Sequence, residues 1–179
     1  MQENVSLIHA KPCESPNCRT ERVISPSWPL TIEAEGFDPS HAVSDPEASK
    51  RAALQVSDTQ SQPAYWGCLR ILAYGQFTVR YTIKAIAIPP QIKDDEDVAR
   101  IEYDGYPKGE KAGRTIKAGE LRRSSGYQTF TYEVNHRKIN LPGEFKLLVY
   151  RPATLLFDQI GVTPTSDQSS FSTLSFLSR

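Results

Sequence analysis

Alternation of apolar and polar residues over positions 77–84 limits the possible folds of this chain more than any other feature of its sequence. Phe77, Val79, Tyr81 and Ile83 are each followed by a polar residue. Because successive side chains of a strand point to opposite faces of its sheet, this pattern predicts a strand with one buried face.

The same pattern recurs along the chain and predicts roughly eight or nine strands, separated by turn-forming pairs such as Asp104-Gly105. The expected strands cover residues 30–35, 53–57, 77–84, 98–103, 115–121, 127–134, 145–150 and 155–162. A short helix is expected over residues 45–53, because Asp45 can cap it and Pro46 suits its first turn. No longer amphipathic run supplies the crossover helices of an α/β fold. The sequence therefore predicts an all-β sandwich of two packed antiparallel sheets.

The length of 179 residues suits one domain with flanking segments. Four prolines lie in the first 29 residues, so residues 1–29 are expected to form an extended arm. Residues 164–179 are rich in serine, which is typical of a tail or linker. The sandwich domain is therefore expected over residues 30–163.

The charge balance gives no reason to expect a nucleic-acid partner. Lys and Arg number 21 and so do Asp and Glu, so the chain has no net field that attracts phosphate. No apolar run approaches the ~20 residues of a spanning helix, so no membrane insertion is expected. The first residues also lack the basic and apolar regions of a secretory signal.

The cysteines allow two interpretations. Cys13 and Cys18 are close enough in sequence to form a disulfide, which would favour an oxidising compartment, or they are two free thiols. His9 adds a third possible zinc ligand to this pair, but no fourth is evident. Cys68 lies in an apolar stretch and is expected to be buried.

Six segments form an ordered set of motifs along the chain. They are Thr31-Ile32-Glu33-Ala34-Glu35, Asp45-Pro46-Glu47-Ala48-Ser49, Trp66-Gly67, Tyr74-Gly75-Gln76-Phe77-Thr78-Val79, Tyr127-Gln128-Thr129-Phe130 and Leu156-Phe157-Asp158-Gln159-Ile160. Each motif alone has low specificity, but in this order they resemble the family 6 and family 35 carbohydrate-binding modules. The resemblance covers residues 30–163. It implies a galactose-binding-like jelly roll, a structural calcium ion (Ca²⁺), and a polysaccharide or other glycan as ligand.

Glu33, Glu35 and Asp158 are the candidate calcium ligands. Glu33 and Glu35 are two residues apart in an expected strand, so both carboxylates point to the same face. The resemblance implies that the first and last strands pair, which brings Asp158 to the same point. Calcium takes about six to eight oxygen ligands, and carboxylates suit it. The alternative is that both glutamates face solvent or pair with a neighbouring Lys or Arg.

Tyr65, Trp66 and Tyr106 are the candidate sugar-binding residues. A sugar site needs an aromatic surface for the apolar side of a pyranose ring, with a few polar groups around it. Tyr65 and Trp66 precede an expected strand, and Tyr106 lies in a glycine-containing loop. The alternative for each of them is packing, above all for Trp66, which stands at the position where the family has an aromatic residue before glycine.

The sequence contains no evident catalytic constellation. The acidic run at residues 94–97 is typical of a solvated loop, and neither His41 nor His136 belongs to a serine elbow or a zinc motif. The expected function is therefore a non-catalytic glycan-binding accessory domain of a larger carbohydrate-active or cell-surface protein, located outside the cell.

Two departures from the family pattern weaken the resemblance, and the second of them, together with the long arm and the tail with its isolated apolar residues, favours an alternative function. Cys68-Leu69 stands where the family has Pro-Tyr, and glycan-binding members often place an asparagine shortly before the last-strand aspartate. This chain has Leu155, Leu156 and Phe157 there. The alternative is a structural or protein-interaction domain that mediates assembly with other domains or subunits.

Overall fold

The computed structural model describes residues 29–36, 38–57, 64–71, 75–105, 110–136 and 142–165, with the backbone alone for residues 64–66, 68–71 and 142. The strands of this part of the chain are β1 (Leu30–Glu33), β2 (Ala42–Ser44), β3 (Ala52–Ser57), β4 (Ala64–Ile71), β5 (Gly75–Ala87), β6 (Asp97–Gly105), β7 (Lys111–Lys117), β8 (Gln128–His136), β9 (Pro142–Val149) and β10 (Thr154–Pro164). Its helices are two 3-10 turns, η1 (Ala34–Gly36) and η2 (Pro39–His41), and the single-turn α1 (Ala118–Leu121). None of the helices in the described ranges has the length and apolar character that crossing a bilayer requires.

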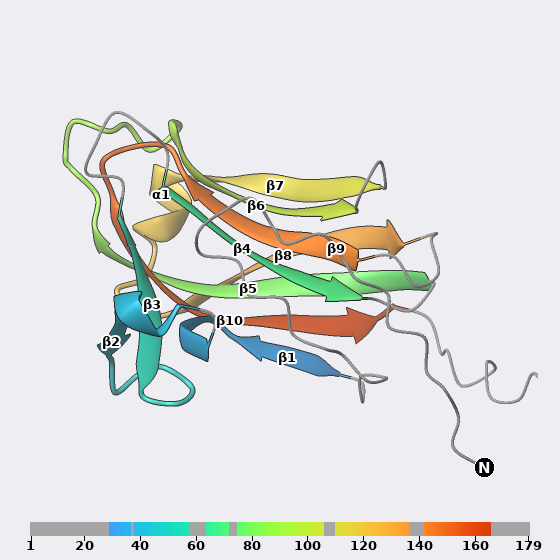
Figure 1. Ribbon diagram of the computed structural model, residues 1–179. Coiled ribbons are helices and arrows are strands. Elements are labelled where there is room, and N and C mark those ends of the chain that lie inside the picture. The colour runs from blue at the N-terminus through green and yellow to red at the C-terminus, as the bar shows by residue number, and fades with distance from the viewer. Residues whose placement is uncertain are drawn as a thin grey trace, which may run out of the picture.

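The strands form two antiparallel sheets that lie face to face (Figure 1). The larger sheet has the order β2-β3-β10-β5-β8, with β1 also paired to β10, and the smaller has the order β4-β9-β6-β7. From β5 to β10 the chain crosses repeatedly from one sheet to the other, as in a jelly roll. The expected all-β jelly-roll sandwich is confirmed.

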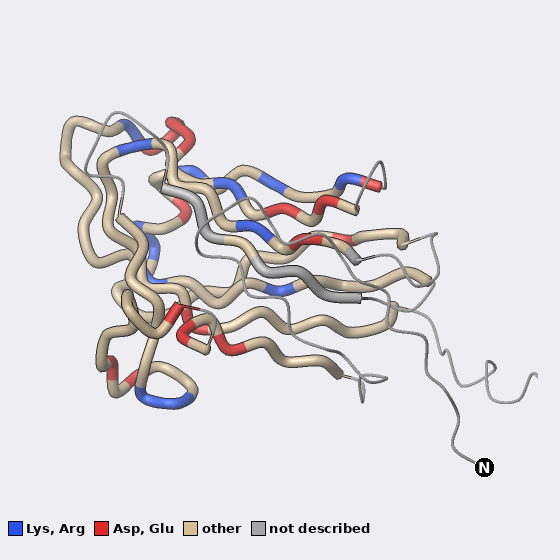
Figure 2. The backbone as a smooth tube through the Cα atoms, in the orientation of Figure 1, with Lys and Arg blue, Asp and Glu red and all other residues tan. Residues whose placement is uncertain are grey.

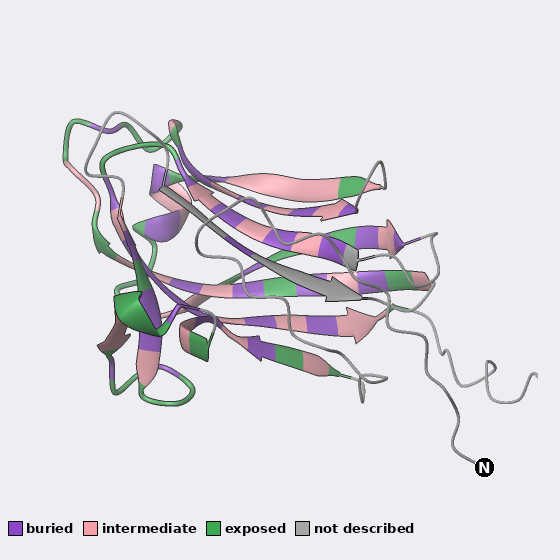
Figure 3. Cartoon of the chain, viewed as in Figure 1, coloured by how far each residue is buried: buried purple, intermediate pink, exposed green. Residues whose placement is uncertain are grey.

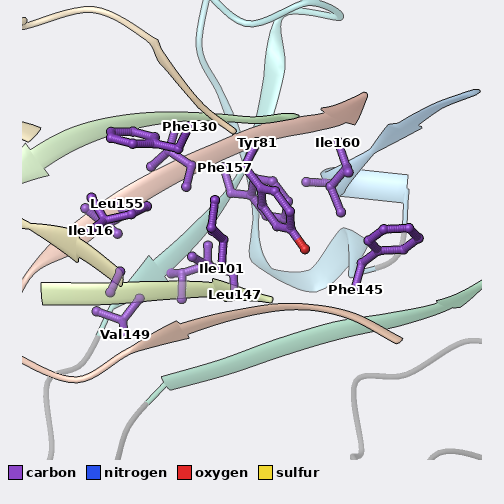
Figure 4. Close-up of a cluster of buried hydrophobic side chains, with 14 of the residues drawn as sticks. Tyr81, Ile101, Ile116, Phe130, Phe145, Leu147, Val149, Leu155, Phe157 and Ile160 are labelled. Atoms are coloured by element: carbon purple, nitrogen blue, oxygen red, sulfur yellow. The ribbon is translucent and has the colours of Figure 1, made fainter. Parts of the chain in front are cut away.

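The core lies between the sheets and follows the predicted alternation. In β5, Phe77, Val79, Tyr81 and Ile83 are fully buried, while the residues between them are more exposed (Figure 3). Tyr81 stacks on Phe157 of β10, with ring centroids 5.4 Å apart and an angle of 12° between the planes (Figure 4). Each fully buried side chain of this size contributes roughly 1.5–3 kcal/mol, so this apolar layer is a main source of stability.

β10 is the strand that joins the rest of the larger sheet. It pairs with β5 along one edge, and along the other its residues 154–157 pair with β3 and its residues 159–162 pair with β1. The expected pairing of the first and last strands is confirmed. The β10–β5 register shifts between Phe157 and Gln159, so Asp158 is the extra residue of a β-bulge. Asp158 therefore lies where the partner of β10 changes from β3 to β1.

Two expected strands end early. The first strand ends at Glu33, because residues 34–36 turn into the 3-10 helix η1, so the expectation of a strand to residue 35 is wrong. The strand expected to reach residue 121 ends at Lys117, directly before α1. The Glu120 side chain accepts a hydrogen bond from the Lys117 backbone N–H at 3.1 Å, which favours a helical turn at this point.

Two further expectations are also wrong. Residues 45–51 form successive hydrogen-bonded turns and no helix, with the Ala48 N–H donating to the Asp45 carbonyl and the Arg51 N–H to the Ala48 carbonyl. The cause is tertiary, since side chains of this turn bond to distant strands, as described below. Tyr65 and Trp66 lie within β4, whereas the sequence placed them before a strand.

Gly143 in β9 leaves the space that the Tyr103 hydroxyl occupies. A Cβ atom at Gly143 would lie 1.9 Å from Tyr103 Oη, and the ring is fully buried with its hydroxyl 2.8 Å from His136 Nδ1. Because the ring has no room to move away, we expect Gly143→Ala to lower the free energy of unfolding by about 1–3 kcal/mol in urea titrations. Gly161→Ala is the control, since its Cβ would have its nearest neighbour at 3.9 Å. Equal losses in both variants would contradict this explanation.

Candidate functional site

Three segments that are far apart in the sequence meet at the bulge of β10. Ser49, in the turn after β2, connects the other two: its Oγ lies 2.7 Å from Glu33 Oε2 and 2.8 Å from Asp158 Oδ1. The Ser49 backbone N–H also donates to Asp158 Oδ1 at 3.0 Å. Acidic residues lie along the end of β1 and the start of η1 (Figure 2). We call Glu33, Glu35 and Asp158 the carboxylate cluster.

The Ser49 hydroxyl cannot satisfy both carboxylates. A hydroxyl has one proton to donate, so it donates either to Glu33 or to Asp158 at a given moment. The other contact then joins two electron-rich oxygens at less than 3 Å. Asp158 is buried with 3% of its surface exposed, so water screens this contact poorly. The arrangement favours an added cation at this point.

Of the three carboxylates, Glu35 has the surroundings that are least favourable for a negative charge. Its Oε2 is buried and has no hydrogen-bond partner. Burial raises the pKa of the Glu35 carboxyl, and the nearby charges of Glu33 and Asp158 raise it further. Lys50 offers little compensation, because its Nζ lies 3.7 Å from Glu33 Oε1 and its side chain is 64% exposed.

The turn that carries Ser49 is held at its other end by the half-buried Lys84, which pairs with the buried Asp45 and the exposed Glu47. Lys84 Nζ on β5 lies 3.0 Å from Asp45 Oδ2 and 2.8 Å from Glu47 Oε2. The Tyr127 hydroxyl donates to Asp45 Oδ2 at 3.3 Å, and Lys84 Nζ lies 5.5 Å from the centre of the Tyr127 ring. A bond from the Glu47 N–H and those from Lys84 lower the pKa of Asp45. We call Asp45, Glu47, Lys84 and Tyr127 the anchor group.

The spacing of the acidic side chains is not that of a metal site, whereas the chemistry of their donor atoms suits one. Across the described ranges no group of three or more His, Cys, Asp or Glu side chains has the spacing of a formed metal site. The Ser49 hydroxyl occupies the space between two of the acids. All donors are nevertheless oxygens, and one of them is a buried carboxylate oxygen without a partner, which fits a hard cation such as calcium. The sequence predicted Glu33 and Glu35 on one face of the same strand. In the structure Glu33 ends β1, and Glu35 lies in η1.

The candidate sugar-binding residues can be placed only in part. In the β4–β9 register, Tyr65 lies opposite Leu148 and Trp66 lies opposite Leu147. Only the backbone of Tyr65 and Trp66 is described. Tyr106 lies outside the described residues altogether. Among the residues whose side chains are described, Tyr150, directly after β9, is an exposed aromatic residue, with 38% of its surface accessible.

Cys13, Cys18 and His9 also fall outside the described residues, as do most of the expected arm and tail. Cys68 lies in β4, where only the backbone is described. The disulfide, the free thiols and the flanking segments stay predictions.

One Asp, Ser and His set occurs in the described ranges, but it has the wrong arrangement for a catalytic triad. His41 Nδ1 lies 2.8 Å from Asp38 Oδ2 and 3.2 Å from Ser40 Oγ. A triad requires the acid on one ring nitrogen and the nucleophile on the other, so that the ring can pass a proton between them. Both contacts here use the same nitrogen. The second described histidine, His136, is 1% exposed and its Nδ1 contacts the Tyr103 hydroxyl in the core.

The fold is similar to solved carbohydrate-binding modules. No family model matches the sequence, and neither does any curated protein. The C-terminal family 6 module of a laminarinase from Zobellia galactanivorans shares 15% identity over 75% of this chain and 98% of that module, with a TM-score of 0.48. A family 6 module of lichenase 5A from Cellvibrio mixtus, solved with cellotriose, shares 12% identity over 76% of this chain and 98% of that module, also with a TM-score of 0.48.

A xylanase fragment from Clostridium thermocellum that contains a family 22 module, solved with xylohexaose, shares 13% identity. The match covers 70% of this chain and 24% of that one, with a TM-score of 0.45. At these identities and TM-scores, the likeness carries no conclusion about what this chain binds or does.

Proposed function

We propose that this chain is a non-catalytic glycan-binding domain that acts outside the cell as part of a larger carbohydrate-active or cell-surface protein. One observation carries the proposal. Three of the segments that resemble the family 6 and 35 modules, around Glu33, Ser49 and Asp158, make direct hydrogen bonds although more than a hundred residues separate the last two. Similar motifs that matched by chance would have no reason to meet at one point.

We further propose that the carboxylate cluster holds a calcium ion with a structural role. Glu33, Glu35 and Asp158 would supply the carboxylate oxygens. Two observations support this: Glu33 and Asp158 both contact Ser49, and their charges act on the nearby Glu35 carboxyl. When bound, the ion would supply positive charge that the cluster lacks. The bound ion would join the first strand, the last strand and the turn, and would thereby stiffen this edge of the larger sheet.

Tyr65, Trp66 and Tyr106 remain the candidate sugar-contacting residues. Aromatic rings give a sugar an apolar surface, and neighbouring polar groups fix its orientation. Affinity electrophoresis against neutral and acidic polysaccharides, followed by a glycan array, tests the proposal. We expect at least one polysaccharide to retard the unchanged protein. We expect Trp66→Ala or Tyr106→Ala to weaken binding to it at least tenfold.

Tyr150→Ala is the control for this experiment, because it removes an exposed aromatic side chain that is not a candidate. We expect it to bind as the unchanged protein does. If the folded protein shows no retardation by any polysaccharide and no array signal, the glycan-binding proposal is wrong.

A second candidate function is protein interaction, and one observation favours it. Leu155, Leu156 and Phe157 directly precede Asp158 and are buried at 0%, 5% and 0% exposure. None of them has a side-chain amide to offer to a sugar hydroxyl, as the asparagine of glycan-binding modules does. A stable oligomer in solution, cross-linked through residues 1–29 or 165–179 and without a sugar response, would support this function.

A further inference from the structure

We propose that Lys84 is a positioning residue for the carboxylate cluster: through Asp45 it fixes the turn that places Ser49 on Asp158, and so it sets the affinity of the cluster for a divalent cation. This inference rests on the proposed cation site. Its first part, the placement of Ser49, is independent of any ion. Lys84 belongs to β5 and has no contact with Glu33 or Asp158 among its described hydrogen bonds and ion pairs.

The first step is that Asp45 organises the whole turn. Its N–H donates to the Arg51 carbonyl, its own carbonyl accepts from the Ala48 N–H, and its Oδ1 accepts from the Glu47 N–H at 3.0 Å. The turn closes with Arg51 at a φ of 57°, a left-handed conformation that is unfavourable for a side chain of this kind. Contacts around the turn must therefore hold it in place.

The second step is that Lys84 holds Asp45. The side chains of Asp45 and Lys84 are only 6% and 16% exposed, so their contact at 3.0 Å is shielded from water. Breaking such a pair by removing one partner leaves a buried charge uncompensated. Lys84 pairs in register with Leu156, two residues before Asp158. Lys84 of the anchor group therefore lies beside the same strand, β10, that carries Asp158 of the carboxylate cluster.

The third step is that the turn carries Ser49 between these two points. Ala48 packs with Ala53 and Leu156 in a small apolar cluster on the outer face of the larger sheet, and Tyr127 packs against that cluster. Ser49 follows directly and bonds to Asp158 through both its N–H and its hydroxyl. A shift of Asp45 would move Ala48 and Ser49 with it, because they belong to the same hydrogen-bonded turn.

The test compares Lys84→Met with Lys146→Met. Lys146 is a matched control: its side chain is 14% exposed and contacts the three acids Glu102, Asp104 and Glu144, but it lies in the smaller sheet. Hydrogen exchange reports the protection of the Ser49 amide, and calorimetric titration with calcium chloride reports the dissociation constant. We expect Lys84→Met to speed exchange at Ser49 and to weaken calcium binding about tenfold or more, in the range seen when groups behind metal ligands are removed. Lys146→Met is expected to change neither.

The outcomes separate the two proposals. If the unchanged protein binds no calcium, the cation site is wrong, and exchange at Ser49 alone decides whether Lys84 positions the turn. Equal effects of the two variants, or none in Lys84→Met, would overturn the positioning role. Should Lys84→Met not fold, Tyr127→Phe removes one bond to Asp45, and it must give a smaller increase of exchange at Ser49 for the inference to stand.

Discussion

Phe157→Ala is expected to lower the free energy of unfolding by about 3–5 kcal/mol, the range for loss of a buried aromatic ring. Phe157 is fully buried, and its ring stacks on Tyr81 of the neighbouring strand. It is also the last residue of β10 that pairs with β3 before the bulge. Urea denaturation with an unchanged m-value gives the measurement.

Phe157→Leu is the matched control, because it keeps an apolar side chain and leaves a smaller cavity. We expect a loss of less than half that of the alanine variant. A loss below about 1 kcal/mol in Phe157→Ala would mean that the packing between β5 and β10 contributes far less than its burial indicates.

Calcium is expected to stabilise the protein by about 3–4 kcal/mol at neutral pH when its free concentration is 100–1,000 times the dissociation constant. The reason is electrostatic, since the half-buried Glu35 has one buried carboxylate oxygen without a partner and lies near the charges of Glu33 and Asp158. Asp158→Asn keeps an acceptor for Ser49 but removes one negative charge. We expect it to abolish most of the calcium effect and to leave the calcium-free protein as stable as before or slightly more stable.

Glu133→Gln is the control, because Glu133 is an exposed acid of β8 that bonds to Thr78 away from the cluster. It is expected to keep the full calcium effect. Thermal and urea unfolding, each with calcium chloride and with a chelator, provide the comparison. A calcium effect of the same size in Asp158→Asn would place the ion elsewhere in the molecule.

The strands could be predicted wherever one face is buried and the other meets solvent. β5 shows this alternation over its whole middle, and β8 and β9 follow it as well. The bulge of β10 could not be predicted in this way, because residues 155–158 are all buried and the sequence there shows an apolar run without alternation.

The turn at residues 45–51 and the anchor group could not be predicted in the same way. Local propensity favours a helix there, but Asp45 bonds to Lys84 and Ser49 bonds to Asp158, contacts that no local pattern contains. Lys84 occupies the polar phase of β5, where a lysine ordinarily faces water. Its burial follows from the turn that covers it. That Glu33 and Asp158 lie close together could be predicted only from the family resemblance, because pairing between the first and last strands depends on topology.

A crystal structure grown in calcium chloride, with anomalous scattering data, tests most directly whether the carboxylate cluster is a cation site. The result we predict is one anomalous peak with oxygens of Glu33, Glu35 and Asp158 at about 2.3–2.6 Å and with the Ser49 hydroxyl no longer shared between two acids. Ordered density for the cluster as described above, with the hydroxyl still between Glu33 and Asp158 and no peak, would contradict it.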